Sequence, residues 1–153
     1  MGTSQPAVRR LAAFAVIAAL SLAHARAEGG QCAKADFEVV VEVAAGSLRD
    51  LNAKNKPVFQ EKLRNLKYKR GWTHEQFLQE AAPLVRDDKI ADFDQSTDDL
   101  LSAIASMGQE GASAKTPDCA LLLDLRARMK TLVDTQTAKW TYMFEKIETE
   151  LNK

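Results

Sequence analysis

Two cysteines are the residues of this 153-residue sequence with the most definite chemistry. Neither Cys32 nor Cys119 has a second cysteine or a histidine beside it, so the spacings typical of redox and zinc sites are missing. In an oxidising compartment, two thiols of a small domain usually pair. We therefore predict a Cys32–Cys119 disulfide that closes a loop of about 87 residues and stabilises the fold by about 4 kcal/mol. Two free thiols are the alternative.

A basic segment between residues 54 and 70 could hold an anion. It carries seven lysines and arginines against Glu61 alone, a local charge near +6. Such a surface suits a lipid headgroup, a phosphate, a nucleic acid or an acidic protein. The alternative is a solvated helix face that pairs with the acidic stretch 75–99, whose net charge is −6. The candidate anionic-ligand surface consists of Lys62, Arg64, Lys67, Tyr68, Lys69, Arg70 and Trp72.

Other residues with chemical potential do not form recognisable sites. The acidic stretch 92–99 alternates oxygen side chains as a calcium loop does, but Thr97 stands where glycine is needed and Ala103 where a glutamate should close the site. His74 alone makes neither a zinc site nor a catalytic triad. The glutamates at 145, 148 and 150 read as a solvated helix face. We predict no catalytic, cofactor-binding or metal-ligating residue.

The first 27 residues have the three parts of a cleavable signal peptide. Arg9 and Arg10 precede an apolar run at 11–22, and Ala25-Arg26-Ala27 fits a signal peptidase. The run of about 12 residues is too short for a membrane span, which needs about 20. We expect cleavage after residue 27 and a periplasmic or secreted protein with no membrane span.

The mature chain, residues 28–153, should form a single domain. Cleavage removes three arginines and leaves 18 basic against 21 acidic residues, so the net charge becomes −3. This near-neutral balance argues against a nucleic-acid partner, because general binding to phosphates requires a large basic excess. The length is sufficient for one compact core.

Helical periodicity dominates the mature chain. The first predicted helix has an apolar stripe, although residues 36–44 also alternate as a strand does; its members are Phe37, Val41, Ala44, Leu48 and Leu51. The polar residues 52–56 predict a break, with Pro57 in the first turn of a second helix that ends at Gly71. Thr73 and Gln76 then predict a capping box, and Trp72 and Phe77 a hydrophobic staple across it.

The second half predicts two further helices. Pro83 should interrupt or end the helix that begins at Thr73. The next stripe runs from Ile90 to Met107 with Gly108 as the C-terminal cap, followed by a loop at 108–115. Thr116 and Pro117 predict the start of a final helix of about 35 residues, with a bend near 134–137 where threonines cluster. Its predicted stripe is Cys119, Leu122, Arg126, Met129, Val133, Gln136, Trp140, Met143, Ile147 and Leu151.

These elements predict an all-α fold: a small bundle of four to five helices with a long C-terminal helix and one disulfide. Because Cys32 precedes the first helix and Cys119 begins the last, the bond predicts that these two helices run parallel.

The expected function is binding or protein interaction rather than catalysis, with an anionic ligand or an acidic protein as candidate partner. One alternative is a periplasmic stress chaperone, since an export signal, two cysteines and lysine-rich helices resemble the layout of small disulfide-bonded acid chaperones. The other is a small helical enzyme of the chorismate-mutase type, which works with scattered Arg, Lys and Glu or Gln side chains. Neither the partner nor the oligomeric state follows from the sequence.

Overall fold

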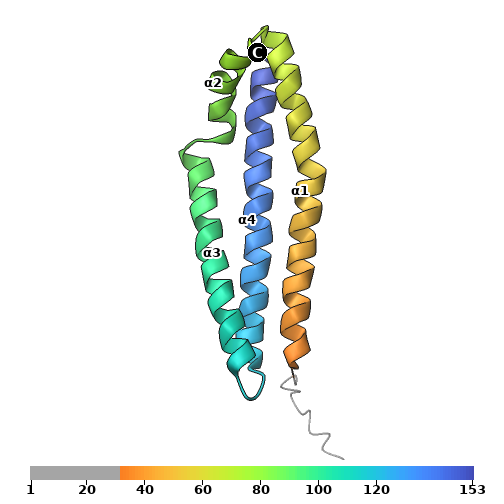
Figure 1. Ribbon diagram of the computed structural model, residues 1–153, viewed down its shortest axis with the longest axis vertical. Helices are drawn as coiled ribbons and strands as arrows, with labels where there is room; N and C mark the ends of the chain where they lie inside the picture. The colour runs from red at the N-terminus through yellow and green to blue at the C-terminus, as the bar shows by residue number, and fades with distance from the viewer. Residues whose placement is uncertain (1–31) are drawn as a thin grey trace, which may run out of the picture.

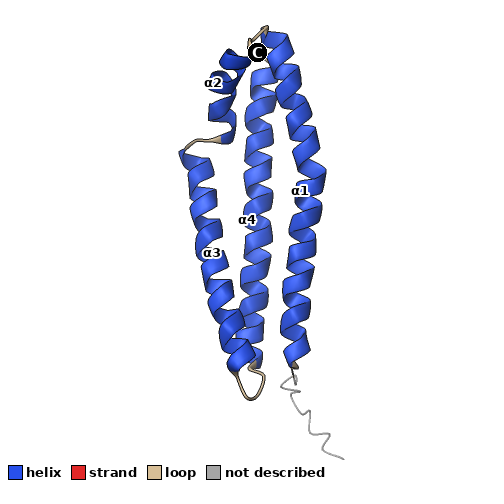
Figure 2. Ribbon diagram, in the orientation of Figure 1, coloured by secondary structure: helices blue, strands red, loops and turns tan. Residues whose placement is uncertain are grey.

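The computed structural model describes residues 32–153, and this part of the chain is helical throughout apart from short connections (Figure 2). The helices are α1 (Lys34–Arg70), α2 (His74–Val85), α3 (Asp88–Ser113) and α4 (Cys119–Leu151). The predicted all-α bundle with a long final helix is confirmed. None of these four helices contains a stretch long and apolar enough to span a bilayer. The predicted signal peptide, residues 1–27, lies outside the described residues.

α4 is the central element of the bundle. It lies between α1 on one side and α2 and α3 on the other (Figure 1). α1 and α3 pack along α4, but they have few contacts with each other. α1 and α4 start at the same end of the molecule and run parallel, as predicted from the two cysteines, whereas α3 runs in the opposite direction.

α1 begins two residues after Cys32 and includes residues 36–44, so the strand interpretation of this segment is wrong. The Asp36 carboxylate accepts a hydrogen bond of 2.7 Å from the Ala33 N–H, which satisfies one free donor of the first turn. The buried positions are Val40 and Ala44, while Val41 is 41% exposed. The predicted apolar stripe was therefore wrong at Val41, where the helix buries the preceding valine instead.

The predicted break at residues 52–56 is also wrong, because α1 continues through Pro57. Pro57 removes one helical hydrogen bond, to the carbonyl of Ala53. Both residues are exposed, so water can solvate that carbonyl. On either side of the proline, Ala44 and Phe59 are buried in the bundle core. Packing along α4 thus holds one long helix where local propensity predicted two.

Gly71 ends α1 as predicted. Its φ of +62° is left-handed, a conformation that glycine adopts without a Cβ clash, and its N–H donates to the Tyr68 carbonyl over 3.2 Å. The predicted capping box then starts α2: the Gln76 N–H donates to Thr73 Oγ1 at 3.2 Å, and the Thr73 N–H donates to Gln76 Oε1 at 2.9 Å. α2 continues past Pro83 for two residues and ends at Val85.

Gly108 does not end α3, and most of the predicted 108–115 loop is helical to Ser113. Another glycine of this segment, Gly111, packs against α1. A Cβ on Gly111 would lie 3.0 Å from the Phe37 ring of α1, so the glycine makes room for this aromatic side chain. Gly111 therefore permits close packing between α3 and α1 instead of forming a loop.

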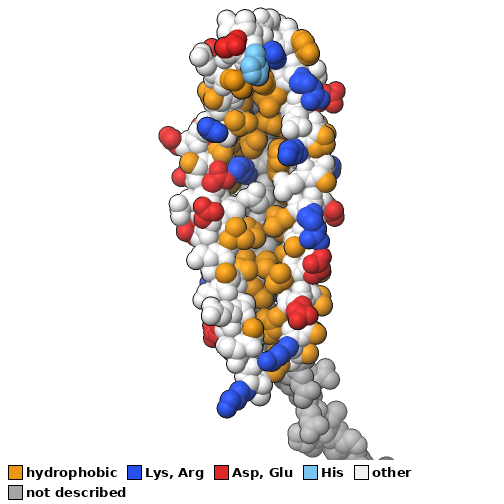
Figure 3. Space-filling view, in the orientation of Figure 1, with side chains coloured by type: hydrophobic (Ala, Val, Ile, Leu, Met, Phe, Trp, Pro, Cys, Tyr) orange, Lys and Arg blue, Asp and Glu red, His pale blue; other side chains and the backbone are white. Residues whose placement is uncertain are grey.

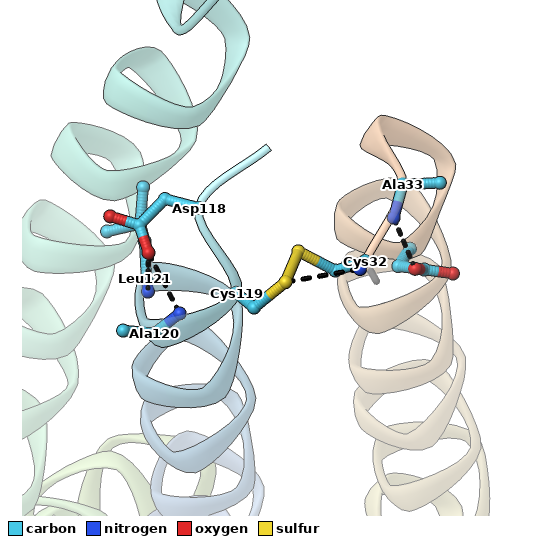
Figure 4. Close-up of a disulfide and its surroundings, with 7 residues drawn as sticks. Cys32, Ala33, Asp118, Cys119, Ala120 and Leu121 are labelled. Carbon is cyan, nitrogen blue, oxygen red and sulfur yellow. Dashed lines mark hydrogen bonds between the residues drawn. A yellow bond between two sulfur atoms is a disulfide. The ribbon is translucent and has the colours of Figure 1, made fainter. Parts of the chain in front are cut away.

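α4 starts two residues later than Thr116 and Pro117 predicted. Asp118 is its N-cap, and Oδ1 accepts hydrogen bonds from the Ala120 and Leu121 N–H groups at 2.8 and 3.2 Å (Figure 4). The helix is continuous over 33 residues, without an interruption at 134–137. In that region the Thr137 hydroxyl donates to the Val133 carbonyl at 2.8 Å, within the helix. The predicted stripe placed Arg126 in the core, but Leu125 is buried there instead.

The core is divided into two apolar clusters. One lies at the disulfide end and consists of Val40, Ala44, Ile104, Met107, Leu122, Leu125, Met129 and Leu132. The other lies at the α2 end and consists of Phe59, Leu66, Leu84, Ile90, Met143 and Ile147. Between them Trp140 Nε1 donates to Asn52 Oδ1 at 3.1 Å, and Gln136 Nε2 donates to Thr97 Oγ1 at 2.6 Å. These hydrogen bonds form a polar layer across α1, α4 and α3.

α1 and α4 pack in a fixed register. The disulfide joins residues separated by 87 positions, and the Asn52–Trp140 hydrogen bond joins residues 88 apart. Residue n of α1 therefore lies at about the height of residue n + 87 of α4. This register determines which side chains of the two helices lie side by side.

Candidate functional site

The predicted anionic-ligand surface lies at the C-terminal end of α1, beside the end of α4. Much of its charge is used within the molecule. Lys62 forms an ion pair with Glu148. The Arg70 guanidinium pairs with Glu150 at 3.3 Å and also donates to the Glu150 carbonyl at 3.0 Å. Lys69 Nζ donates to the carbonyl of Leu151. These contacts attach the end of α4 to α1.

The remaining residues of this surface divide into two groups. Lys67 Nζ stands 5.7 Å from the centre of the Phe77 ring, and half-buried Trp72 packs against the apolar cluster at this end. Tyr68 is 78% exposed, and Arg64 is exposed without an ion pair in the part of the chain described. The anionic-ligand surface stays a prediction, now centred on Arg64 and Tyr68.

The acidic residues that pair with this surface are not the ones that the sequence suggested. The sequence suggests that the basic segment pairs with the acidic stretch 75–99. Its ion pairs instead reach Glu148 and Glu150 on α4, which the sequence suggested were solvated. The parallel register explains the difference, because the C-terminal ends of α1 and α4 lie side by side (Figure 1).

Sequence reasoning missed a polar cluster at the α2–α3 junction. Asp87, the N-cap of α3, accepts hydrogen bonds from the Ile90 N–H and the Tyr142 hydroxyl, both at 2.8 Å. Lys146 forms an ion pair with the same carboxylate and donates to the Pro83 carbonyl. The partners are 55 and 59 positions away from Asp87 in the sequence, so no local motif could reveal them.

The electrostatics of this cluster favour an ionised Asp87. The Lys146 hydrogen bond, followed by that from the Ile90 N–H, lowers the pKa of Asp87 to about 2. The hydrogen bond to Asp87 raises the pKa of Tyr142, whose ring also lies 4.2 Å from Lys89 Nζ. A tyrosine whose pKa is raised stays protonated and is a poor base. The arrangement acts as a clamp that holds the start of α3 against α4.

An apolar groove lies between α1 and α3 at the disulfide end, which we call the α1–α3 groove. Its volume is about 470 Å³. The space-filling view shows hydrophobic side chains along the centre of the molecule, between α1 and the α2–α3 side (Figure 3). The groove exists because α1 and α3 pack on α4 without closing over it. Its lining is Lys34, Phe37, Glu38, Val41, Glu42, Gly108, Gly111, Ala112 and Leu125.

A second groove lies on the other side of the first part of α1, between that helix and α4, which we call the α1–α4 groove. Its volume is about 350 Å³. Val39 and Val43, which line its α1 side, are 58% and 64% exposed. Its lining is Val39, Val40, Val43, Ala44, Ser47, Arg126, Met129, Lys130, Val133 and Asp134.

The acidic stretch 92–99 lies entirely on α3, so its side chains point around a helix and do not wrap an ion as a calcium loop would. Within residues 32–153, no group of three or more His, Cys, Asp or Glu side chains is placed to hold a metal ion. Exposed His74 occupies the first position of α2.

Comparisons with protein-family models, with curated proteins and with solved structures found no match to this chain.

Proposed function

We propose that this chain is an exported, periplasmic protein that acts by binding an apolar segment of a partner protein in the α1–α3 groove. The observation that carries the proposal is the open arrangement of the bundle. Three long helices leave an apolar groove between α1 and α3, lined by Phe37 and the 41% exposed Val41, that no fourth helix covers, and an amphipathic helix would complete the packing. Export is supported by the signal-like residues 9–27 and by the cysteine pair, which suits an oxidising compartment.

Gly108 offers a direct test, because it lines the groove and a Cβ added there would meet no atom within 4 Å. Gly108→Leu should fill the groove without a clash and should also favour the helix. The probes are an apolar fluorescent dye, anilinonaphthalene sulfonate, and an amphipathic helical peptide that competes with it. We expect saturable binding at neutral pH that is at least tenfold weaker in the variant.

Gly46→Leu is the matched control. Gly46 lies inside α1 but lines neither groove, and the nearest atom to an added Cβ is the flexible Arg49 guanidinium at 3.8 Å. The control variant should bind like the unmodified protein. Equal binding by the Gly108 and Gly46 variants, with both folded by circular dichroism, would refute the groove as the site.

A second candidate function, an acid-activated chaperone, is favoured by the ion pairs around α4. Four of them join α4 to its neighbours, and each depends on a carboxylate: Lys62–Glu148, Arg70–Glu150, Lys139–Asp94 and Lys146–Asp87. Acid would neutralise these carboxylates, while the disulfide would still hold the other end of α1 and α4. The predicted result is an opened bundle that exposes its apolar interior.

Asp87 gives this candidate a defined pH window. Its pKa in the folded protein, about 2, lies below the ordinary value of 3.8. A depressed pKa contributes stability that is complete above the ordinary value and is lost as the pH falls from about 4 through 2. Asp87→Asn should therefore lower the melting temperature by a few degrees at pH 7 and have little effect at pH 2. The matched control is Asp124→Asn, at an exposed pair within α4, which should change little at either pH.

The measurements are melting curves between pH 7 and pH 2, together with light scattering from an aggregating client protein at pH 2–3. The chaperone candidate requires opening and suppressed aggregation in the same pH range. A protein that keeps its fold at pH 2 and does not protect the client would exclude it.

A further inference from the structure

We propose that the α1–α4 groove binds a fatty acid, with the carboxylate at Arg126 and the alkyl chain along Val43 and Val133. The volume of the groove, about 350 Å³, lies at the lower end of the range for small-molecule sites and suits one alkyl chain. The apolar part of its lining consists of Val39, Val40, Val43, Ala44, Met129 and Val133. The groove shares no lining residue with the α1–α3 groove, so its ligand is independent of the proposed function.

The exposed valines of α1 provide the apolar contact. Val39 and Val43 are 58% and 64% exposed, although they lie beside buried Val40 and Ala44. An alkyl chain laid along the groove would remove these side chains from water, which is favourable in proportion to the apolar area that it covers.

The charged side chains of the groove select a negative head group. Arg126 and Lys130 both line it. The basic residues that follow Arg126 on α4 are already paired, Arg128 with Asp124 and Lys130 with Asp134. Arg126 is exposed and, within residues 32–153, forms no ion pair. Because a guanidinium can donate two parallel hydrogen bonds to one carboxylate, Arg126 is the group of this groove that is free to bind an anion.

The register of the two helices gives the site a direction. Residue n of α1 lies at about the height of residue n + 87 of α4, so Arg126 lies level with Val39, and Asp134 lies level with Ser47. Between these two levels α1 rises by about 12 Å. A carboxylate at the Ser47 end would face Asp134, whereas at the Val39 end it meets Arg126. The ligand therefore has its charge at one end and its apolar chain along the rest, as a fatty acid does.

A titration of the mature, disulfide-bonded protein with sodium decanoate, below its micelle concentration, tests the proposal. We expect saturable shifts of amide NMR signals from both helices that line the groove. Arg126→Gln should weaken binding about fivefold, because it removes a charge-assisted pair with the carboxylate at an exposed site. Decyltrimethylammonium, which has the same chain with a positive head group, should leave these signals unshifted.

Three control variants separate the groove from other effects. Arg128→Gln changes a nearby arginine that does not line the groove, and it should bind decanoate like the unmodified protein. Val43→Asp, at an exposed position of α1, should abolish binding, because it sets a like charge beside the chain and the carboxylate. Leu123→Asp, at a similarly exposed position of α4 outside the groove, should have no effect. Gly108→Leu, which fills the α1–α3 groove, should also leave decanoate binding unchanged.

Four results would each overturn the proposal. The first is a set of shifts that do not saturate or that lie outside the groove. The second is an equal loss of binding in the Arg126 and Arg128 variants. The third is decyltrimethylammonium binding at the same residues with the affinity of decanoate. The fourth is an acidic amphipathic peptide that binds the groove when decanoate does not, which would assign this surface to a protein partner.

Discussion

Replacing both cysteines with serine should lower the free energy of unfolding by about 4 kcal/mol and the melting temperature by about 15 °C. The Cys32 and Cys119 Cα atoms lie 5.5 Å apart, within the usual range for a disulfide, and the bond closes 87 residues of chain (Figure 4). Removing it releases the unfolded chain from this constraint, which is the main source of the stabilisation. Urea denaturation followed by circular dichroism measures the difference.

Removal of the disulfide should also change the folded state. Cys32 lies two residues before the start of α1, and at this end α1 contacts α3 through Phe37 and Gly111. Without the bond, the first turns of α1 should fray, and their amide hydrogens should exchange faster than those around Leu66. Reducing the unmodified protein with dithiothreitol should reproduce both effects. A change below 1 kcal/mol, or two reactive thiols in the denatured unmodified protein, would contradict the prediction.

The disulfide was predictable because its chemistry depends on few residues and on compartment rather than on local conformation. The helix boundaries were predictable where a local motif determines them. The capping box of Thr73 and Gln76 and the glycine cap at residue 71 were recognised because every interacting group lies within a few residues. The hydrogen bonds of these motifs need no residue from another part of the chain.

Prediction failed where distant packing overrides a local signal. Pro57 and Gly108 usually mark breaks, yet both lie inside long helices. For Pro57 a neighbouring helix provides the explanation, because α1 packs on α4 both before and after the proline, through Ala44 and Phe59. Gly108 has no such neighbour, but the glycine that follows it, Gly111, lies against Phe37 of α1. The Asp87 clamp was missed for the same reason. The sequence supplies a candidate N-cap there, but its partners on α4 are identified only once the helices are assembled.

Truncation of a buried core side chain should also lower the free energy of unfolding by a large amount. Leu66→Ala, at a fully buried position in the cluster at the α2 end, should cost about 3 kcal/mol in the free energy of unfolding. The leucine packs among side chains from all four helices, so neighbouring groups cannot close the cavity without moving a helix. Leu123→Ala, at a position of α4 that is 62% exposed, is the matched control and should change stability by less than about 0.5 kcal/mol.

The division of the core into two clusters also predicts how the costs of two truncations combine. Leu125 belongs to the cluster at the disulfide end, and the Asn52–Trp140 hydrogen bond lies in the polar layer between the two clusters. Leu66→Ala and Leu125→Ala share no packing partner, so their costs should add within about 0.5 kcal/mol in the double variant. Leu66→Ala combined with Ile147→Ala should depart from additivity, because both residues lie in one cluster and their cavities can merge. Urea denaturation of the three single and two double variants provides the comparison. Strong coupling between Leu66 and Leu125 would mean that the polar layer does not separate the clusters, and that the bundle is held by one continuous core.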